Sequence, residues 1–247
     1  MCQPASSGRR IAFFGGSFDP PHMGHLAVAR AARAALGLDT VLFAPVGTQP
    51  LKPTGSTASF DDRVAMTRLA ITGDPGFEIS LADAPKPSGA PNYTVDTLIS
   101  LKSELPPDCT IHFLMGADSL AGLRRWHRAT EIAFIAPLIV ASRPGQPLDD
   151  LKALLPAGLA MEAADTPDLL ESDVEVRSYS LLCRAGDRAG QRAPLYLLPG
   201  LDVEISASRI RELARAQFGS GEGSRAADRE LLPDGVSSYI RSHGLYR

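Results

Sequence analysis

The chain has 247 residues, of which 44% are hydrophobic and 21% are charged, a composition typical of globular proteins and not of disordered or fibrous chains. Its formal net charge of -3 supplies no general positive field, which argues against nucleic acid or an anionic membrane as a partner. The longest apolar stretch, Ile132 to Ala141, is much shorter than the roughly 20 residues of a spanning helix, which excludes membrane insertion.

The cysteines indicate the compartment. Cys2, Cys109 and Cys183 lie far apart in the sequence, and an odd, sparse set of this kind is a poor disulfide framework. We expect residues 1–10 to form a disordered tail, because the apolar run that follows them is too short for the core of a signal peptide. These observations favour a reducing, cytoplasmic location.

Buried strands and helices alternate along the rest of the chain. Continuous apolar runs predict strands at 11–14, 40–46, 77–80, 110–115, 137–141 and 194–198. Apolar residues at helical spacing, together with capping residues, predict helices at 25–36, 59–71, 94–105, 206–214 and 233–243.

This alternation predicts an α/β fold with a doubly wound, mostly parallel sheet, helices on both faces and a C-terminal helical segment. Residues 11–247 are expected to form a single domain. The periodicity weakens between about 146 and 193, where we expect irregular structure or an insertion. Ligands of such sheets bind beyond the carboxyl ends of the strands, where the strand order reverses.

The most informative segment follows the first predicted strand and reads GGSFDPPHMGH, residues 15–25. Gly15 and Gly16 allow a ligand to approach the backbone, and the start of the next helix offers free N–H groups to a phosphate. His22 and His25 are three residues apart with Gly24 between them, so both imidazoles can face the same anion. The alternatives are zinc ligands, for which no third ligand stands at a recognisable spacing, and a turn with two surface histidines.

GGSFDPPHMGH resembles the nucleotidyltransferase superfamily with a His-x-Gly-His signature, and within it the bacterial nicotinate-nucleotide adenylyltransferases most of all. Further similarity covers about residues 11–143 and 194–247. It includes the segments PNYTVDTL at 91–98, GADSL at 116–120, Trp126, ISASRIR at 205–211 and the closing GLYR at 244–247.

The resemblance implies a Rossmann-like fold and the transfer of AMP from ATP to nicotinate mononucleotide, with nicotinate adenine dinucleotide and pyrophosphate as products, in NAD biosynthesis. It implies Mg²⁺ bound through the ATP phosphates, with no metal site on the protein. The catalytic residues that it implies are His22, His25, Lys52 and Arg211. The implied ATP-binding residues are Gly15, Gly16, Ser17, Gly24, Gly116, Asp118, Ser206 and Ser208. Those implied for nicotinate mononucleotide are Tyr93, Thr94, Trp126 and Arg143.

Two positions depart from the family pattern. Leu51 stands where relatives often have a histidine before the lysine, which puts one phosphate contact in doubt, whereas Lys52 is retained. Ser208 stands in the place of a threonine and keeps the hydroxyl.

Several implied site residues also have simpler structural interpretations. Ser206 is equally suited to capping a helix, Asp118 and Thr94 could each cap the helix that they begin, and Trp126 could pack in the core. The glycine-rich GSGEGS at 219–224 follows no predicted strand and is expected to be a flexible surface loop.

Two other functions remain open from the sequence. One is another adenylyl or cytidylyl transferase of the same fold, and the other is a non-catalytic nucleotide sensor. Intact His22, His25, Ser206 and Arg211 argue against the sensor. A homo-oligomer also remains open.

Overall fold

The structure is a computed structural model that describes residues 8–52, 55–142, 148–165, 174–201, 205–220 and 231–247. Its elements in chain order are β1 (Arg10–Gly16), α1 (Met23–Leu36), β2 (Thr40–Pro45), α2 (Phe60–Ile71), β3 (Phe77–Ile79), α3 (Thr94–Glu104), β4 (Thr110–Gly116), α4 (Ala117–Gly122), the 3₁₀ helix η1 (Leu123–Arg125), α5 (Ala129–Ile135), β5 (Leu138–Ala141), α6 (Leu148–Leu154), β6 (Leu159–Ala163), β7 (Arg177–Cys183), the 3₁₀ helix η2 (Gly186–Arg188), β8 (Arg192–Leu198), α7 (Ala207–Ser220) and α9 (Asp234–His243).

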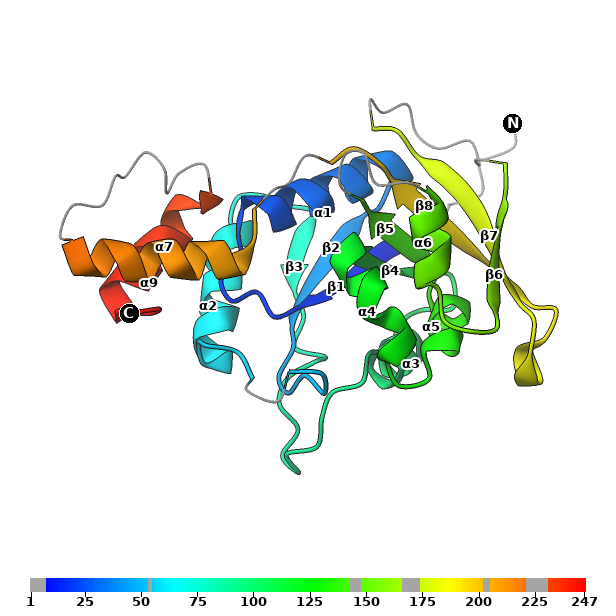
Figure 1. Ribbon diagram of the computed structural model, residues 1–247, viewed down its shortest axis with the longest axis horizontal. Helices are drawn as coiled ribbons and strands as arrows, with labels where there is room; N and C mark the ends of the chain where they lie inside the picture. Colours follow the sequence, from blue (N-terminus) through cyan, green and yellow to red (C-terminus); the bar gives the residue numbers. More distant parts are fainter. Residues whose placement is uncertain (1–7, 53–54, 143–147, 166–173, 202–204, 221–230) are drawn as a thin grey trace.

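The strands form one sheet of eight strands in the order β3-β2-β1-β4-β5-β8-β7-β6 (Figure 1). Neighbours from β3 to β8 pair in parallel, and the β8–β7 and β7–β6 pairs are antiparallel. The chain leaves β1 for β2 on one side and later enters β4 on the other, so the strand order reverses at β1 and β4. The doubly wound, mostly parallel sheet is therefore confirmed, and the reversal marks where a ligand is expected.

The sheet buries an apolar layer on each face because successive side chains of a strand point in opposite directions. Ile11 and Phe13 of β1 belong to the core that the sheet shares with α3, α4 and α5. Ala12 and Phe14 belong to the other core, which contains residues of α1, α2, α7 and α9. Helices on both faces agree with the sequence-based expectation.

The region from 146 to 193 has more regular structure than the expected irregular segment or insertion. It contains α6, β6 and β7, and the two strands extend the sheet in antiparallel fashion. Strand β6 lies at the edge of the sheet and has no fully buried residue. An exposed edge strand needs no apolar run, which is why the sequence pattern there is weak.

Smaller differences occur at the ends of elements. Strand β1 begins at Arg10, within the expected tail, and residues 1–7 lie outside the described part of the chain. Helix α7 continues through Gly219 to Ser220, where a loop was expected, because one glycine weakens a helix by about 1 kcal/mol without forbidding it. Residues 221–224 are outside the described ranges. Within those ranges, no helix is long and apolar enough to cross a membrane.

Candidate active site

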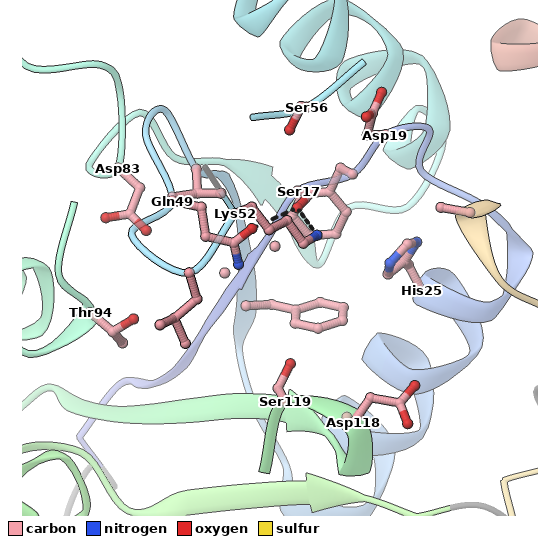
Figure 2. A pocket seen from close by; sticks show the side chains of 18 of the residues that line it. Ser17, Asp19, His25, Gln49, Lys52, Ser56, Asp83, Thr94, Asp118 and Ser119 are labelled. Carbon is pink, nitrogen blue, oxygen red and sulfur yellow. Dashed lines mark hydrogen bonds between the residues drawn. The ribbon is translucent and has the colours of Figure 1, made fainter. Parts of the chain in front are cut away.

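A cavity of about 870 Å³ opens at the carboxyl ends of β1 and β4. Every residue that the sequence and the resemblance assigned to the site lines this cavity, except Arg143, which lies outside the described residues. Figure 2 shows Thr94 and Asp83 toward one end, His25 and Asp19 toward the other, and Ser17, Gln49 and Lys52 between them. Pockets for ligands usually measure about 300 to 1,000 Å³, so this one is large enough for a sizeable ligand.

The loop after β1 has a backbone that its own phenylalanines constrain. A Cβ added to Gly16 would lie 3.1 Å from the Phe18 ring, and one added to Gly15 would lie 3.0 Å from the Phe13 ring. A side chain at either position would therefore crowd a phenylalanine ring, which favours glycine there on packing grounds as well as for access of a ligand. Phe18 is buried at a φ of 47°, a conformation that a non-glycine residue adopts only at a cost.

His22 and His25 form a stacked pair at the start of α1, with ring centroids 3.7 Å apart. His25 Nδ1 accepts a hydrogen bond of 3.2 Å from the backbone N–H of His22, which leaves the proton of a neutral His25 on Nε2. Burial lowers the pKa of His22 to about 4, and burial followed by the charge of His22 lowers the pKa of His25 well below its usual value. Both rings are therefore neutral at pH 7.

His22 also has an unused polar atom. Its Nδ1 is buried and has no hydrogen-bond partner within the described part of the chain. Buried polar atoms are nearly always paired in native proteins; the backbone N–H of His25, which faces this side chain in a capping-box arrangement, is one candidate partner, and a ligand in the cavity that His22 lines is the other. The two histidines line the cavity, and no cluster of three or more His, Cys, Asp or Glu side chains suited to a metal occurs among the described residues.

Ser17, in the loop after β1, and Lys52, in the loop after β2, both line the cavity. Lys52 Nζ donates to Ser17 Oγ at 3.0 Å, and Ser17 Oγ donates to Gln49 Oε1 at 3.3 Å (Figure 2). Burial, and then the charge of Arg211, lower the pKa of Lys52. An anion placed between these two cations would relieve their repulsion.

Helix α7 and the residue before its first turn bring Arg211, Ser208 and Ser206 to the same cavity. Arg211 Nη1 donates to the carbonyl oxygen of Asp19 at 2.7 Å, and its Nη2 donates to Ser208 Oγ at 3.2 Å. Ser206 Oγ accepts from the N–H of Arg209 at 3.3 Å, so it caps the helix and also lines the cavity. The capping and ligand-binding interpretations of Ser206 are thus compatible.

The other end of the cavity is built by α3 and Trp126. The side chain of Tyr93 does not cap the helix, and its carbonyl oxygen accepts from the N–H groups of Asp96 and Thr97, so neither the side chain nor the carbonyl of Tyr93 takes up the N–H groups of Thr94 and Val95. Its ring lies 4.5 Å from the ring of His127, and Trp126 is half-buried beside Phe113, with centroids 6.0 Å apart. Trp126 therefore packs on the core and lines the cavity at once.

Asp118 and Ser119 follow Gly116 at the end of β4 and lie on the wall opposite Lys52 (Figure 2). Asp118 belongs to the first turn of α4, a short helix whose preceding residue, Gly116, provides no side-chain cap. A carboxylate at the end of a parallel strand is well placed to accept hydrogen bonds from ribose hydroxyls.

Five buried residues around the cavity were missed by sequence reasoning: Asp19, Arg63, Asp83, Asn92 and Tyr246. Arg63 donates to the carbonyls of Ser17 and Val46, at 2.7 and 2.8 Å. The hydroxyl of Thr97 donates a hydrogen bond to the carboxylate of Asp83, and burial raises the pKa of that carboxyl group. Asp19, Asn92 and Tyr246 stood in segments quoted above, so their place in those segments was the available sign, whereas Asp83 stood in none.

The chain is similar to known proteins over nearly its whole length. The cytidylyltransferase-like family profile matches residues 13–213. A protein of Gloeobacter violaceus named "Probable nicotinate-nucleotide adenylyltransferase" is 39% identical over 239 residues, which cover 97% of each chain. A protein of the same name from Aeromonas hydrophila is 37% identical over 96% of this chain and 97% of its own.

Solved structures share the fold. Nicotinic acid mononucleotide adenylyltransferase of Plasmodium falciparum, complexed with NaAD, matches with a TM-score of 0.65 and 17% identity, over 96% of this chain and 97% of that one. The same enzyme complexed with APC matches with a TM-score of 0.63. The profile and the relatives together identify the chain as a member of the cytidylyltransferase-like family, in the group of nicotinate-nucleotide adenylyltransferases.

Proposed function

We propose that this protein transfers AMP from ATP to nicotinate mononucleotide, which gives nicotinate adenine dinucleotide and pyrophosphate, as a step of NAD biosynthesis. The proposal is supported by the names of relatives that align over nearly the whole chain. The observation that carries it is the neutral, stacked His22–His25 pair in a cavity that Lys52 and Arg211 also line. We place the reaction in the cytoplasm, where free thiols such as Cys109 and Cys183 persist.

In the proposed reaction an oxygen of the mononucleotide phosphate bonds to the α-phosphorus of ATP. The bond from that phosphorus to the bridging oxygen of the β-phosphate breaks, and its electron pair leaves with pyrophosphate. The attacking phosphate is already ionised at pH 7, since the second pKa of such a group is about 6, so no protein base is required. Catalysis then depends on positioning and on stabilising charge.

The residues of the cavity suit these tasks. His22 and His25 donate N–H groups to the α-phosphate, where charge builds in the transition state. Lys52, Arg211 and the hydroxyls of α7 hold the departing pyrophosphate, and Asp118 accepts from a ribose. At the other end, the free N–H groups at the start of α3 meet the nicotinate carboxylate, and Trp126 faces the pyridine ring.

We further propose that Mg²⁺ takes part as a complex with the ATP phosphates. The cavity offers N–H groups, hydroxyls and cations, and the described residues contain no cluster of three metal ligands, which fits an ion that arrives with its own phosphate and water ligands. When bound, the ion neutralises charge on the triphosphate. Lys52 and Arg211 would contact the oxygens that it leaves free.

Pyrophosphate release tests the function. The purified protein is given ATP or CTP with Mg²⁺ and one acceptor at a time: nicotinate mononucleotide, nicotinamide mononucleotide, phosphopantetheine or an alcohol phosphate. We expect ATP with nicotinate mononucleotide to have the highest kcat/KM. A higher value for CTP, or for a non-pyridine acceptor, would replace the proposal with another transferase of this fold.

The variant His22→Ala is the control for the assay. It removes the proposed donor without touching the adenine or nicotinate ends of the cavity. Binding of ATP without turnover of any acceptor by the unaltered protein would instead identify a nucleotide sensor.

A further inference from the structure

Asp19 is a buried hub beside the cavity, with 5% of its surface exposed. Its carboxylate accepts hydrogen bonds from the backbone N–H groups of Thr57, at 2.6 Å, and Ala58, at 3.0 Å. It also accepts one of 2.7 Å from the hydroxyl of Tyr246, which is 5% exposed itself. Three donors from two distant segments thus satisfy one carboxylate.

The same residue contacts the cavity through its backbone. The carbonyl oxygen of Asp19 accepts from Arg211 Nη1 at 2.7 Å, and Arg211 is the cation that α7 contributes to the cavity. Tyr246 is therefore separated from Arg211 by a single residue. A shift of Asp19 would move the acceptor that fixes the guanidinium.

The backbone on both sides of this contact is held in an unfavourable conformation. Among the described residues, Phe18, Arg128 and Tyr246 are the non-glycine residues with positive φ, and two of them meet here: Phe18, at 47°, precedes Asp19, and Tyr246 has a φ of 65°. Such conformations persist only where surrounding contacts over-determine them, and they gather at functional sites. The Tyr246–Asp19 bond is a contact of this kind.

Charge supports the same arrangement. Burial lowers the pKa values of Lys52 and Arg63, and the Asp19 carboxylate opposes that effect for both groups. Burial, and then Asp19, raise the pKa of Tyr246, so its hydroxyl keeps its proton and remains a donor.

We propose that Tyr246 is a positioning residue for ATP binding, because its hydroxyl fixes Asp19 and thereby the guanidinium of Arg211. The assignment of Arg211 to ATP rests on the proposed function. Tyr246 lies outside the cavity lining, and the hydrogen bond of its hydroxyl goes to Asp19, which in turn accepts from Arg211.

The test compares Tyr246→Phe with Tyr239→Phe. Tyr239 of α9 makes the same kind of bond, from its hydroxyl to Asp62 Oδ1 of α2 at 3.0 Å, but that bond does not reach the cavity. Each variant loses one hydroxyl and keeps its ring. The readouts are the Kd of a non-hydrolysable ATP analogue by calorimetry, the KM of each substrate, and Tm.

For Tyr246→Phe we expect the Kd of the analogue and the KM of ATP to rise about tenfold, which corresponds to about 1.4 kcal/mol. The KM of nicotinate mononucleotide should change less than about twofold. Tyr239→Phe should change neither constant, whatever it does to Tm. Unchanged analogue binding in Tyr246→Phe, or an equal loss in Tyr239→Phe, would overturn the proposal.

A double-mutant cycle distinguishes an effect that acts through Arg211 from a general destabilisation of the fold. In an Arg211→Ala background, Tyr246→Phe should weaken analogue binding little further, because the link runs through Arg211. Fully additive effects would contradict that link. The binding readout needs no acceptor, so a protein that fails to use nicotinate mononucleotide but still shows this pattern would refute the proposed function and leave the role of Tyr246 standing.

Discussion

Replacing His22 by alanine is the most direct perturbation of the proposed chemistry. His22 Nδ1 makes no hydrogen bond of regular geometry among the described residues, and the side chain contributes only a capping-box contact with the N–H of His25. What the fold loses is mainly the stacking against His25, and an aromatic pair contributes about 0.5 to 1.5 kcal/mol. Removing one donor to a developing oxyanion costs about 100- to 1,000-fold in kcat. Activity should therefore fall far more than stability.

The pKa of His22 makes the prediction sharper. Because burial lowers it to about 4, only about one molecule in a thousand of the free enzyme carries a protonated His22 at pH 7. We therefore expect His22 to act as a neutral N–H donor. It should contribute no inflection to kcat/KM for ATP between pH 6 and 8, since that constant reports the groups of the free enzyme.

The assay is pyrophosphate release across pH 5 to 8.5 for the unaltered protein and for His22→Ala, with Tm measured in the same buffers. His25→Ala is a poorer first choice, because the His25 ring packs 4.9 Å from the ring of Phe18 and its loss would open the core. An inflection near pH 6.5 that disappears in His22→Ala would show that the imidazolium is the active form. Full activity in the variant would refute the role of His22 altogether.

Three further predictions follow from the same structure. The N–H groups at the start of α3 favour a carboxylate over a neutral amide by about 1.5 to 3 kcal/mol, so kcat/KM for nicotinate mononucleotide should exceed that for the nicotinamide analogue at least about tenfold. Trp126→Ala should lower kcat/KM for both mononucleotides alike. Similar kcat/KM values for the two in the unaltered protein would reject this pocket. Arg211→Ala should raise the KM of ATP more than that of the mononucleotide, and steady-state kinetics showing the reverse would move Arg211 to the other substrate. Burial lowers the pKa of His112 to about 4, so this group binds a proton in the unfolded chain below pH 6.5 while the folded state does not. The contribution of His112 to the free energy of unfolding is therefore complete above pH 6.5 and about 2 kcal/mol smaller at pH 5. In His112→Gln, the free energy of unfolding measured in urea should fall less between pH 7 and pH 5 than it does in the unaltered protein.

The parts of the fold that sequence predicted are those buried on both sides. Strands β1, β4 and β5 lie inside the sheet between two apolar layers, so nearly every residue of each must be apolar and the run is visible in one sequence. The cavity-lining loop was visible for another reason. Its glycines, prolines and histidines gather in eleven residues, where each type has a local conformational or chemical use.

The features that the sequence did not predict are those whose interaction partners come from distant parts of the chain. Strand β6 is an edge, and its pattern depends on pairing with β7 instead of on burial. Asp83 and Asn92 are buried polar residues satisfied by Thr97, Thr48 and neighbouring backbone. A single sequence shows no periodicity for such residues, because tertiary hydrogen bonds have no fixed spacing.

Asn92 also explains how the two ends of the cavity keep their distance. Its backbone N–H donates to the carbonyl of Thr48 at 2.9 Å, and its side-chain oxygen accepts from the N–H of Thr48 at 3.0 Å. Thr48 belongs to the loop that carries Gln49 and Lys52, and Asn92 directly precedes Tyr93 and α3. The segments that carry the proposed phosphate and pyridine sites are thus joined by a reciprocal pair of hydrogen bonds between Asn92 and Thr48. In-line transfer needs the reacting atoms about 3 to 3.5 Å apart, so in the proposed reaction a link that fixes the separation of these two sites would act directly on the rate.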